Sequence, residues 1–176
     1  KTIMEVATDA EHTTSKMQLL KSLTKNLITK EHPEKLTKTQ CITKFVVKYT
    51  LILVFGSDIV AQDYEKLKDN GITHVLNCAA GYSADYTFKK ELSIQFLFKD
   101  HTRENIECCF YNVIDFFNAA KKEGGRIFVH CVQGISRSTT MCLAYMIFTN
   151  KTTLDDGLNF IRERRQIANP NMTFMA

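Results

Sequence analysis

Apolar residues along the chain fall into short runs typical of strands and longer stretches with helical spacing. The strand-like runs are rich in β-branched and aromatic residues, and they lie at residues 45–47, 51–55, 72–77, 92–98 and 126–130. Helical patterns lie at residues 61–70, 106–123, 137–148 and 153–165, with Gly71 and Gly124 positioned to end the first two. Strands that alternate with helices predict an α/β fold, a central and mostly parallel twisted sheet flanked by helices.

The first 40 residues have a different pattern from the rest. They are polar and lysine-rich, and their modest apolar stripe (Met17, Leu20, Leu23, Leu27 and Ile28) ends before Pro33. We therefore expect an N-terminal extension over residues 1–40, helical where the stripe lies, followed by one α/β domain over residues 41–176. A chain of 176 residues with 44% hydrophobic residues can bury one ordinary core.

Composition and charge exclude several classes of protein. The net charge of +4 is too small and too dispersed to predict nucleic-acid binding, and the near-apolar stretch at residues 45–55 is too short to span a membrane. The cysteines at positions 41, 78, 108, 109, 131 and 142 lack the paired spacing of a zinc site, and no signal peptide precedes them. We expect no bound metal and a reducing compartment, in the cytoplasm or the nucleus.

The segment His130-Cys131-Val132-Gln133-Gly134-Ile135-Ser136-Arg137-Ser138 joins a predicted strand to a predicted helix. The amides of such a loop can converge on one point, and with the helix N-terminus they form a site for a dianion that also favours the thiolate of Cys131. Arg137 offers a planar fork of donors for two phosphate oxygens. Gly134 suits an unusual backbone angle or a close approach to the ligand. If Cys131 acts as a nucleophile, the Ser138 hydroxyl can hydrogen-bond its sulfur when the sulfur later departs as the leaving group.

The run from His130 to Ser138 resembles the signature of the cysteine-based protein tyrosine phosphatases, and in particular their dual-specificity branch. The resemblance extends from about Gly56 to Ala176, through residues 72–77 and Asn169-Pro170-Asn171. It implies that residues 41–176 are a dual-specificity phosphatase catalytic domain, with Cys131 as the nucleophile. Residues 132–137 would then bind the phosphate. No cofactor is expected, because Arg137 and the loop amides would neutralise the phosphate charge.

The resemblance also assigns residues outside the loop. In this family, an aspartate about thirty residues before the cysteine protonates the leaving oxygen. Asp100 occupies the corresponding place in the sequence, and Asp85 is a weaker alternative. His130 would orient the loop, and Asn77 and Asn171 would brace it by hydrogen bonds. Cys78 matches a position where some relatives hold a cysteine that forms a disulfide with the oxidised nucleophile; the alternative is a small buried residue.

The implied function is the removal of phosphate from phosphotyrosine and from phosphoserine or phosphothreonine, through a phosphocysteine intermediate. The substrate would be a phosphoprotein, with MAP kinases the first candidates because the signature and Asn169-Pro170-Asn171 look like MAP kinase phosphatases. Lys21, Lys25 and Leu27 match loosely the segments that dock on such kinases; a solvated helix or a linker is the alternative. Two other functions stay open, a phosphoinositide phosphatase and a catalytically silent phosphoprotein-binding module.

Overall fold

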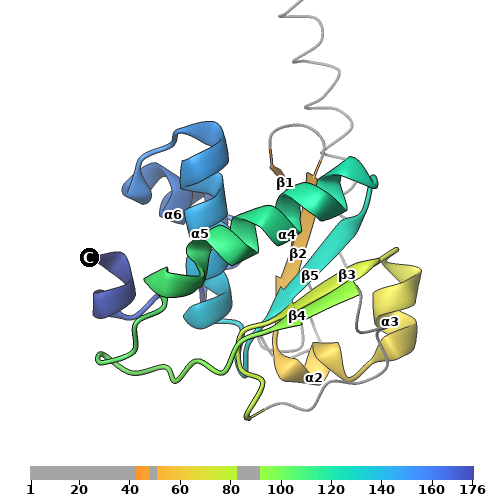
Figure 1. The fold of residues 1–176 in the computed structure, drawn as a ribbon, viewed down its shortest axis with the longest axis horizontal. Coiled ribbons are helices and arrows are strands. Elements are labelled where there is room, and N and C mark those ends of the chain that lie inside the picture. Colours follow the sequence, from red (N-terminus) through yellow and green to blue (C-terminus); the bar gives the residue numbers. More distant parts are fainter. Residues whose placement is uncertain (1–42, 48–50, 83–91) are drawn as a thin grey trace, which may run out of the picture. The chain divides into compact units, whose positions relative to one another are not determined.

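A five-stranded sheet forms the centre of the domain (Figure 1). The computed structural model describes residues 43–47, 51–82 and 92–176. Neighbouring strands follow the order β1 (Thr43–Val47), β2 (Leu51–Gly56), β5 (Arg126–His130), β3 (His74–Asn77), β4 (Ser93–Gln95). The pair β1–β2 is antiparallel, and β2–β5, β5–β3 and β3–β4 are parallel. The predicted α/β fold with a mostly parallel sheet is confirmed.

Successive residues of the central strands face opposite sides of the sheet, and each side has its own apolar cluster. Helices α4 (Phe110–Lys122), α5 (Arg137–Asn150) and α6 (Leu154–Arg162) pack on the side that carries Phe55, Leu76 and Val129. The short helices α2 (Asp58–Ala61) and α3 (Tyr64–Asp69) pack on the other side, against Val54, Val75 and Phe128. Helices therefore cover both faces, as expected for a parallel sheet buried on both sides.

The single helix predicted at residues 61–70 is wrong. Two helices occupy this segment and its neighbours, because the chain leaves α2 after Ala61 and the Asp63 carboxylate caps a new helix by accepting the Lys66 N–H at 2.9 Å. The predicted stop at Gly71 is confirmed. Gly71 has φ +67°, and the amides of Gly71 and Ile72 bond back to the carbonyls of Lys68 and Leu67.

Other element boundaries differ by a few residues from the predicted ones. The strand expected at 92–98 is only the three-residue β4, because its partner β3 ends at Asn77, which pairs with Gln95. A 3-10 turn, η2 (Glu107–Cys109), precedes α4, and a second, η3 (Met172–Met175), ends the described chain. The start of α6 is as predicted, since Thr153 accepts the Asp156 N–H at 3.1 Å.

Several sequence predictions fall outside the described residues. These are the extension at 1–40, its boundary with the catalytic domain, the kinase-docking segment with Lys21, Lys25 and Leu27, and the rival acid Asp85. Within residues 43–47, 51–82 and 92–176, no helix combines the length and the apolar character needed to cross a bilayer.

Candidate active site

The predicted loop lies at the carboxyl end of β5, a central strand of the sheet (Figure 1). Ligands of open α/β sheets bind at this end of the strands. Cys131 directly follows β5 and is only 1% exposed. Its Sγ lies 3.3 Å from the hydroxyl of Ser138, in the first turn of α5, which is within hydrogen-bonding distance. The strand and the helix therefore bring together the two residues predicted to share this contact.

All the carbonyl groups of the loop from Val132 to Ser136 accept hydrogen bonds. Their donors are the amides of Asp58, Asn169 and Thr140, the hydroxyls of Thr139 and Thr140, and the guanidinium of Arg165. A trans peptide directs its N–H opposite to its carbonyl oxygen, so these amides face the inside of the loop. Among the described residues, none of them has a protein acceptor. The loop is thus a concave array of donors suited to an anion.

Gly134 is required by the backbone of this loop. Its φ is +66°, in the left-handed region, and a Cβ at this position would overlap the backbone of Gly56 at the end of β2. The unusual backbone angle expected from the sequence is confirmed. The structure shows a close approach to the backbone at the end of β2, whereas the sequence predicted one to the ligand; it lets the loop turn tightly at the carboxyl end of the sheet.

Arg137 opens α5 and is held from one side. Its Nη1 donates to the carbonyl oxygen of Phe98 at 3.0 Å, and the residue is only 7% exposed. Its Nε lies 3.6 Å from Oδ2 of Asp100, and this buried nitrogen has no hydrogen-bond partner within the described part of the chain. The guanidinium is thus fixed through Nη1, and its Nε forms an ion pair with Asp100 without a hydrogen bond, so Nε can still donate one to a phosphate oxygen.

Asp100 lies directly beside the loop. Its Oδ1 accepts hydrogen bonds from the hydroxyl of Ser136 at 2.8 Å and from Nδ2 of Asn171 at 2.9 Å. The backbone N–H of Asn171 donates in turn to the Ser136 hydroxyl at 3.1 Å. These bonds anchor one carboxylate oxygen and leave Oδ2 on the side of Arg137. Asn171 therefore makes the bracing contacts predicted for it.

Residues 53–176 match the family model described as dual specificity phosphatase, catalytic domain. The chain belongs to this family. Protein-tyrosine-phosphatase MKP1 of Arabidopsis thaliana is 42% identical over 120 residues, which are 68% of this chain and 15% of that protein. Dual specificity protein phosphatase 1 of Homo sapiens is 38% identical over 127 residues, 70% of this chain and 33% of that protein. The chain thus spans a third or less of these two relatives.

The fold of this dual specificity phosphatase domain is also found among solved structures. The crystal structure of DUSP15 superimposes with a TM-score of 0.66 at 31% identity, over 74% of this chain and 81% of that chain. A human tyrosine phosphatase-like serine/threonine/tyrosine-interacting protein gives a TM-score of 0.66 at 26% identity, over 76% and 90% of the two chains. The predicted family resemblance is confirmed.

His130 is buried at the end of β5 in the phosphatase domain. Its ring stacks on Phe128 with centroids 5.5 Å apart, and burial lowers the pKa of its imidazole to about 4. The ring is therefore neutral at neutral pH and brings no positive charge to the neighbouring Cys131. The role of orienting the loop stays a prediction for His130.

Asn77 is the last residue of the neighbouring strand β3, and Cys78 directly follows the strand. The Asn77 side chain accepts the Ala79 N–H at 2.8 Å, a contact within its own segment, so bracing of the loop by Asn77 stays a prediction. The Cys78 N–H donates to the His130 carbonyl at 2.8 Å and ties this segment to the residue before Cys131. Cys78 is fully buried. Burial raises the pKa of its thiol well above the usual value, and the nearby Cys131 raises it further.

Arg165 is a site residue that the sequence did not reveal. It lies just beyond α6 and is 4% exposed, and its Nε and Nη2 donate to the carbonyls of Gly134 at 2.9 Å and Gln133 at 3.2 Å. In the sequence it belongs to the polar run Arg162-Glu163-Arg164-Arg165. Such a run is typical of a solvated surface, and nothing in it distinguishes the one arginine that folds under the loop.

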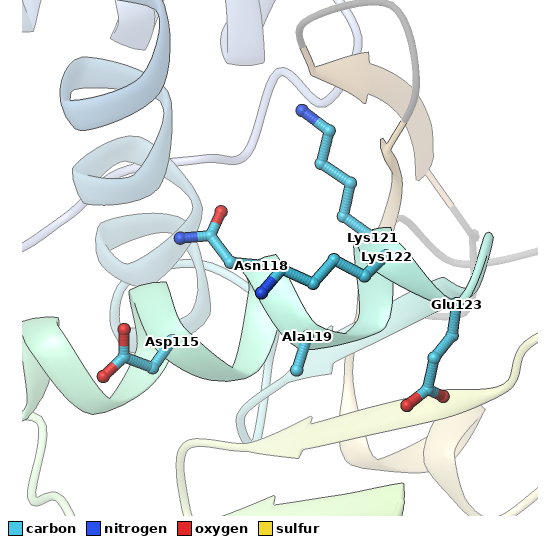
Figure 2. Close-up of a pocket in the computed structure, with 6 residues that line it drawn as sticks. All are labelled: Asp115, Asn118, Ala119, Lys121, Lys122 and Glu123. Atoms are coloured by element: carbon cyan, nitrogen blue, oxygen red, sulfur yellow. The ribbon is translucent and has the colours of Figure 1, made fainter.

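The pocket in Figure 2 lies along α4, away from this site. Its described lining residues are Asp115, Asn118, Ala119, Lys121, Lys122 and Glu123. None of them belongs to the loop that follows β5 or forms a hydrogen bond or ion pair with Asp100. Among the described residues, no group of three or more His, Cys, Asp or Glu side chains could hold a metal ion.

Proposed function

We propose that this domain hydrolyses phosphate esters of tyrosine, serine and threonine in proteins, through a phosphocysteine intermediate. The observation that carries the proposal is the Cys131 sulfur, 3.3 Å from the Ser138 hydroxyl and at the start of a loop whose amides face inward. Family membership over residues 53–176 supports the same activity.

In the first step, the Cys131 thiolate attacks phosphorus, and the bond between phosphorus and the ester oxygen breaks. The loop amides and the Arg137 Nε, which has no hydrogen-bond partner among the described residues, stabilise the charge that spreads over the equatorial oxygens. Asp100 gives its proton, held on Oδ2, to the leaving oxygen, because Oδ1 is occupied by Ser136 and Asn171.

In the second step, water attacks the phosphocysteine and releases inorganic phosphate. Asp100, now a carboxylate, takes a proton from this water, and the Cys131 thiolate leaves. The Ser138 hydroxyl is placed to donate a hydrogen bond to the departing sulfur. Both half-reactions therefore use the same groups, with Asp100 acting first as acid and then as base.

Turnover of para-nitrophenyl phosphate by the reduced protein tests the activity. We expect turnover by the wild type and its loss in Cys131→Ser. A folded wild-type sample without turnover would favour a phosphoprotein-binding module. Faster release of phosphate from phosphoinositides than from phosphopeptides would favour a lipid phosphatase.

MAP kinases are the substrates that we propose first. The support is the likeness of the signature to MAP kinase phosphatases and the 42% identity to protein-tyrosine-phosphatase MKP1. An Asp100→Ala variant that retains bound substrate, incubated with phosphorylated kinases and with phosphopeptides, should capture a doubly phosphorylated MAP kinase in preference to the peptides. Equal capture of all phosphoproteins would contradict this substrate.

We also propose that Cys78 protects the nucleophile as a reversible disulfide with Cys131. Peroxide would oxidise Cys131 to a sulfenic acid. The Cys78 sulfur would then attack the sulfur of Cys131 to form the disulfide, and the sulfenic hydroxyl would leave as water with the proton of the Cys78 thiol. The burial that raises the pKa of Cys78 should make this step slow. Peptide mapping should find the Cys78–Cys131 link, and dithiothreitol should restore less activity in Cys78→Ser than in the wild type. Equal recovery of both proteins would contradict the proposal.

A further inference from the structure

We propose that Arg165 is a positioning residue that aims two amide donors of the loop at the phosphate group of the substrate. This inference rests on the proposed function, since it assumes that the loop binds phosphate. Arg165 itself need not touch the substrate, because it acts on the outer side of the loop through the carbonyls of Gln133 and Gly134.

The two bonds of Arg165 fix the orientation of two consecutive peptide groups. The carbonyl of Gln133 shares a peptide plane with the N–H of Gly134, and the carbonyl of Gly134 shares one with the N–H of Ile135. In a trans peptide the N–H points opposite to the carbonyl oxygen. Holding both oxygens on the outer side therefore directs the amides of Gly134 and Ile135 into the loop.

The other amides of the loop are set by different groups. The carbonyl of Val132, which shares its peptide plane with the Gln133 N–H, accepts a bond from the backbone of Asp58 at 3.1 Å. The carbonyl of Ile135 is held by the Asn169 amide at 2.9 Å. Arg165 is thus the only side chain among the described residues that donates to the carbonyls of Gln133 and Gly134, the middle of the loop.

An arginine suits this position better than a lysine. The guanidinium is planar and its donors diverge at fixed angles, so one side chain reaches two adjacent carbonyls at once. Its charge also lies over the ring of Phe55, 5.5 Å from the centroid, and the side chain is buried. A Cβ on Gly134 would come within 2.8 Å of Nη2, which shows how closely the guanidinium packs against the loop.

The matched control is the neighbouring Arg164. Its guanidinium donates to the Phe160 carbonyl at 2.8 Å and lies 3.6 Å from the Phe160 ring centroid, so its contacts stay within α6 and its end. Arg165→Met removes both the positive charge and the planar set of donors. Arg165→Lys keeps the charge and removes only the planar set of donors. Arg164→Met removes an equal charge one residue away. Arg165→Lys also guards against the chance that the methionine variant does not fold.

The test measures the binding of inorganic phosphate by amide chemical shifts, in a Cys131→Ser background and in samples whose fold is checked by circular dichroism. In the parent protein, phosphate should shift the amides of Gln133, Gly134 and Ile135. In the Cys131→Ser, Arg165→Lys double variant, phosphate should no longer shift the amides of Gly134 and Ile135 but should still shift the amide of Gln133. The Kd for phosphate should rise at least about 10-fold. Arg164→Met should change the Kd less than about 2-fold.

Activity gives a second readout with native Cys131. Arg165→Lys should lower kcat for para-nitrophenyl phosphate by at least about 10-fold, because donors aimed at the transition state are lost. Unchanged phosphate shifts at Gly134 and Ile135 in a folded Arg165→Lys variant would overturn the inference. A wild type that binds phosphate through these amides but has no turnover would overturn only the proposed function. A parent protein without any phosphate response would overturn both.

Discussion

The two halves of the catalytic site are held in different ways. In the phosphate loop, residues 131–136, the carbonyls from Val132 to Ser136 are bound by α2, α5, Arg165 and Asn169, and Cys131 and Ser136 are buried. The acid segment, residues 99–105, contains no helix or strand and is mostly exposed. Side-chain hydrogen bonds attach much of this segment to the rest of the domain. Asp100 bonds to Ser136 and Asn171, and the Thr173 hydroxyl donates to the Thr102 carbonyl at 3.1 Å.

This difference separates two requirements of catalysis. The nucleophile and the oxyanion donors need fixed directions, and buried backbone hydrogen bonds provide them. The acid has only to lie within reach of the leaving oxygen, and a third of the Asp100 side chain is exposed (34%). Changes in the acid segment should therefore lower the rate of proton transfer and leave phosphate binding intact. Changes around the loop should damage both binding and stability.

The largest expected effect is on the acid side. Asp100→Asn removes the proton donor and keeps the shape of the side chain, so kcat for a phosphothreonine peptide should fall by about 10² to 10⁴. The loss with para-nitrophenyl phosphate should be smaller, because its leaving group departs readily without a proton. Steady-state kinetics with both substrates check this prediction. An equal loss with both would mean that Asp100 does not act as the general acid.

On the loop side, His130 should make the stability of the domain depend on pH. Burial lowers the pKa of this residue from 6.5 to about 4, so below pH 6.5 the unfolded chain takes up a proton that the folded chain does not. The stabilising contribution is present above pH 6.5 and is lost as the pH falls towards 4, by up to about 3 kcal/mol. Urea unfolding across this range should show the loss in the wild type and a flatter dependence in His130→Gln. Parallel pH profiles of the two proteins would contradict this origin.

A smaller effect is expected from the bond that joins the two halves. Asn171→Ala removes the donor at 2.9 Å from Oδ1 of Asp100, which should loosen the acid and lower kcat by about 10-fold with little change in KM. In an Asp100→Asn background, the same substitution should have almost no further effect, since the two residues act as a unit. Additive losses in this double-mutant cycle would show that Asn171 works independently of Asp100.

The sequence predicts the loop half better than the acid half. The strand β5, the loop and the start of α5 are contiguous in the chain, so one motif and two apolar patterns suffice to place Cys131, Arg137 and Ser138. Asp100 could be placed only by its spacing and by resemblance, because its partner Asn171 is 71 residues away. No local pattern encodes such a contact.

Two other features depend on tertiary structure in the same way. Asp63 lies within a stretch that has a continuous helical pattern, and the new helix start that it caps is decided by how α2 and α3 pack under the sheet. Arg165 has the local sequence of a surface residue, and its burial follows from the return of the chain past the loop after α6. Charged residues are rarely buried, which makes an exposed arginine the reasonable prediction.

The most direct test of the central claim is to detect the phosphocysteine. A phosphotyrosine peptide would be mixed with the enzyme, the reaction quenched in acid within milliseconds, and the peptide containing Cys131 examined by mass spectrometry. We expect phosphate on Cys131 in the wild type and no adduct in Cys131→Ser. Turnover without an adduct on Cys131, or an adduct on another residue, would contradict it.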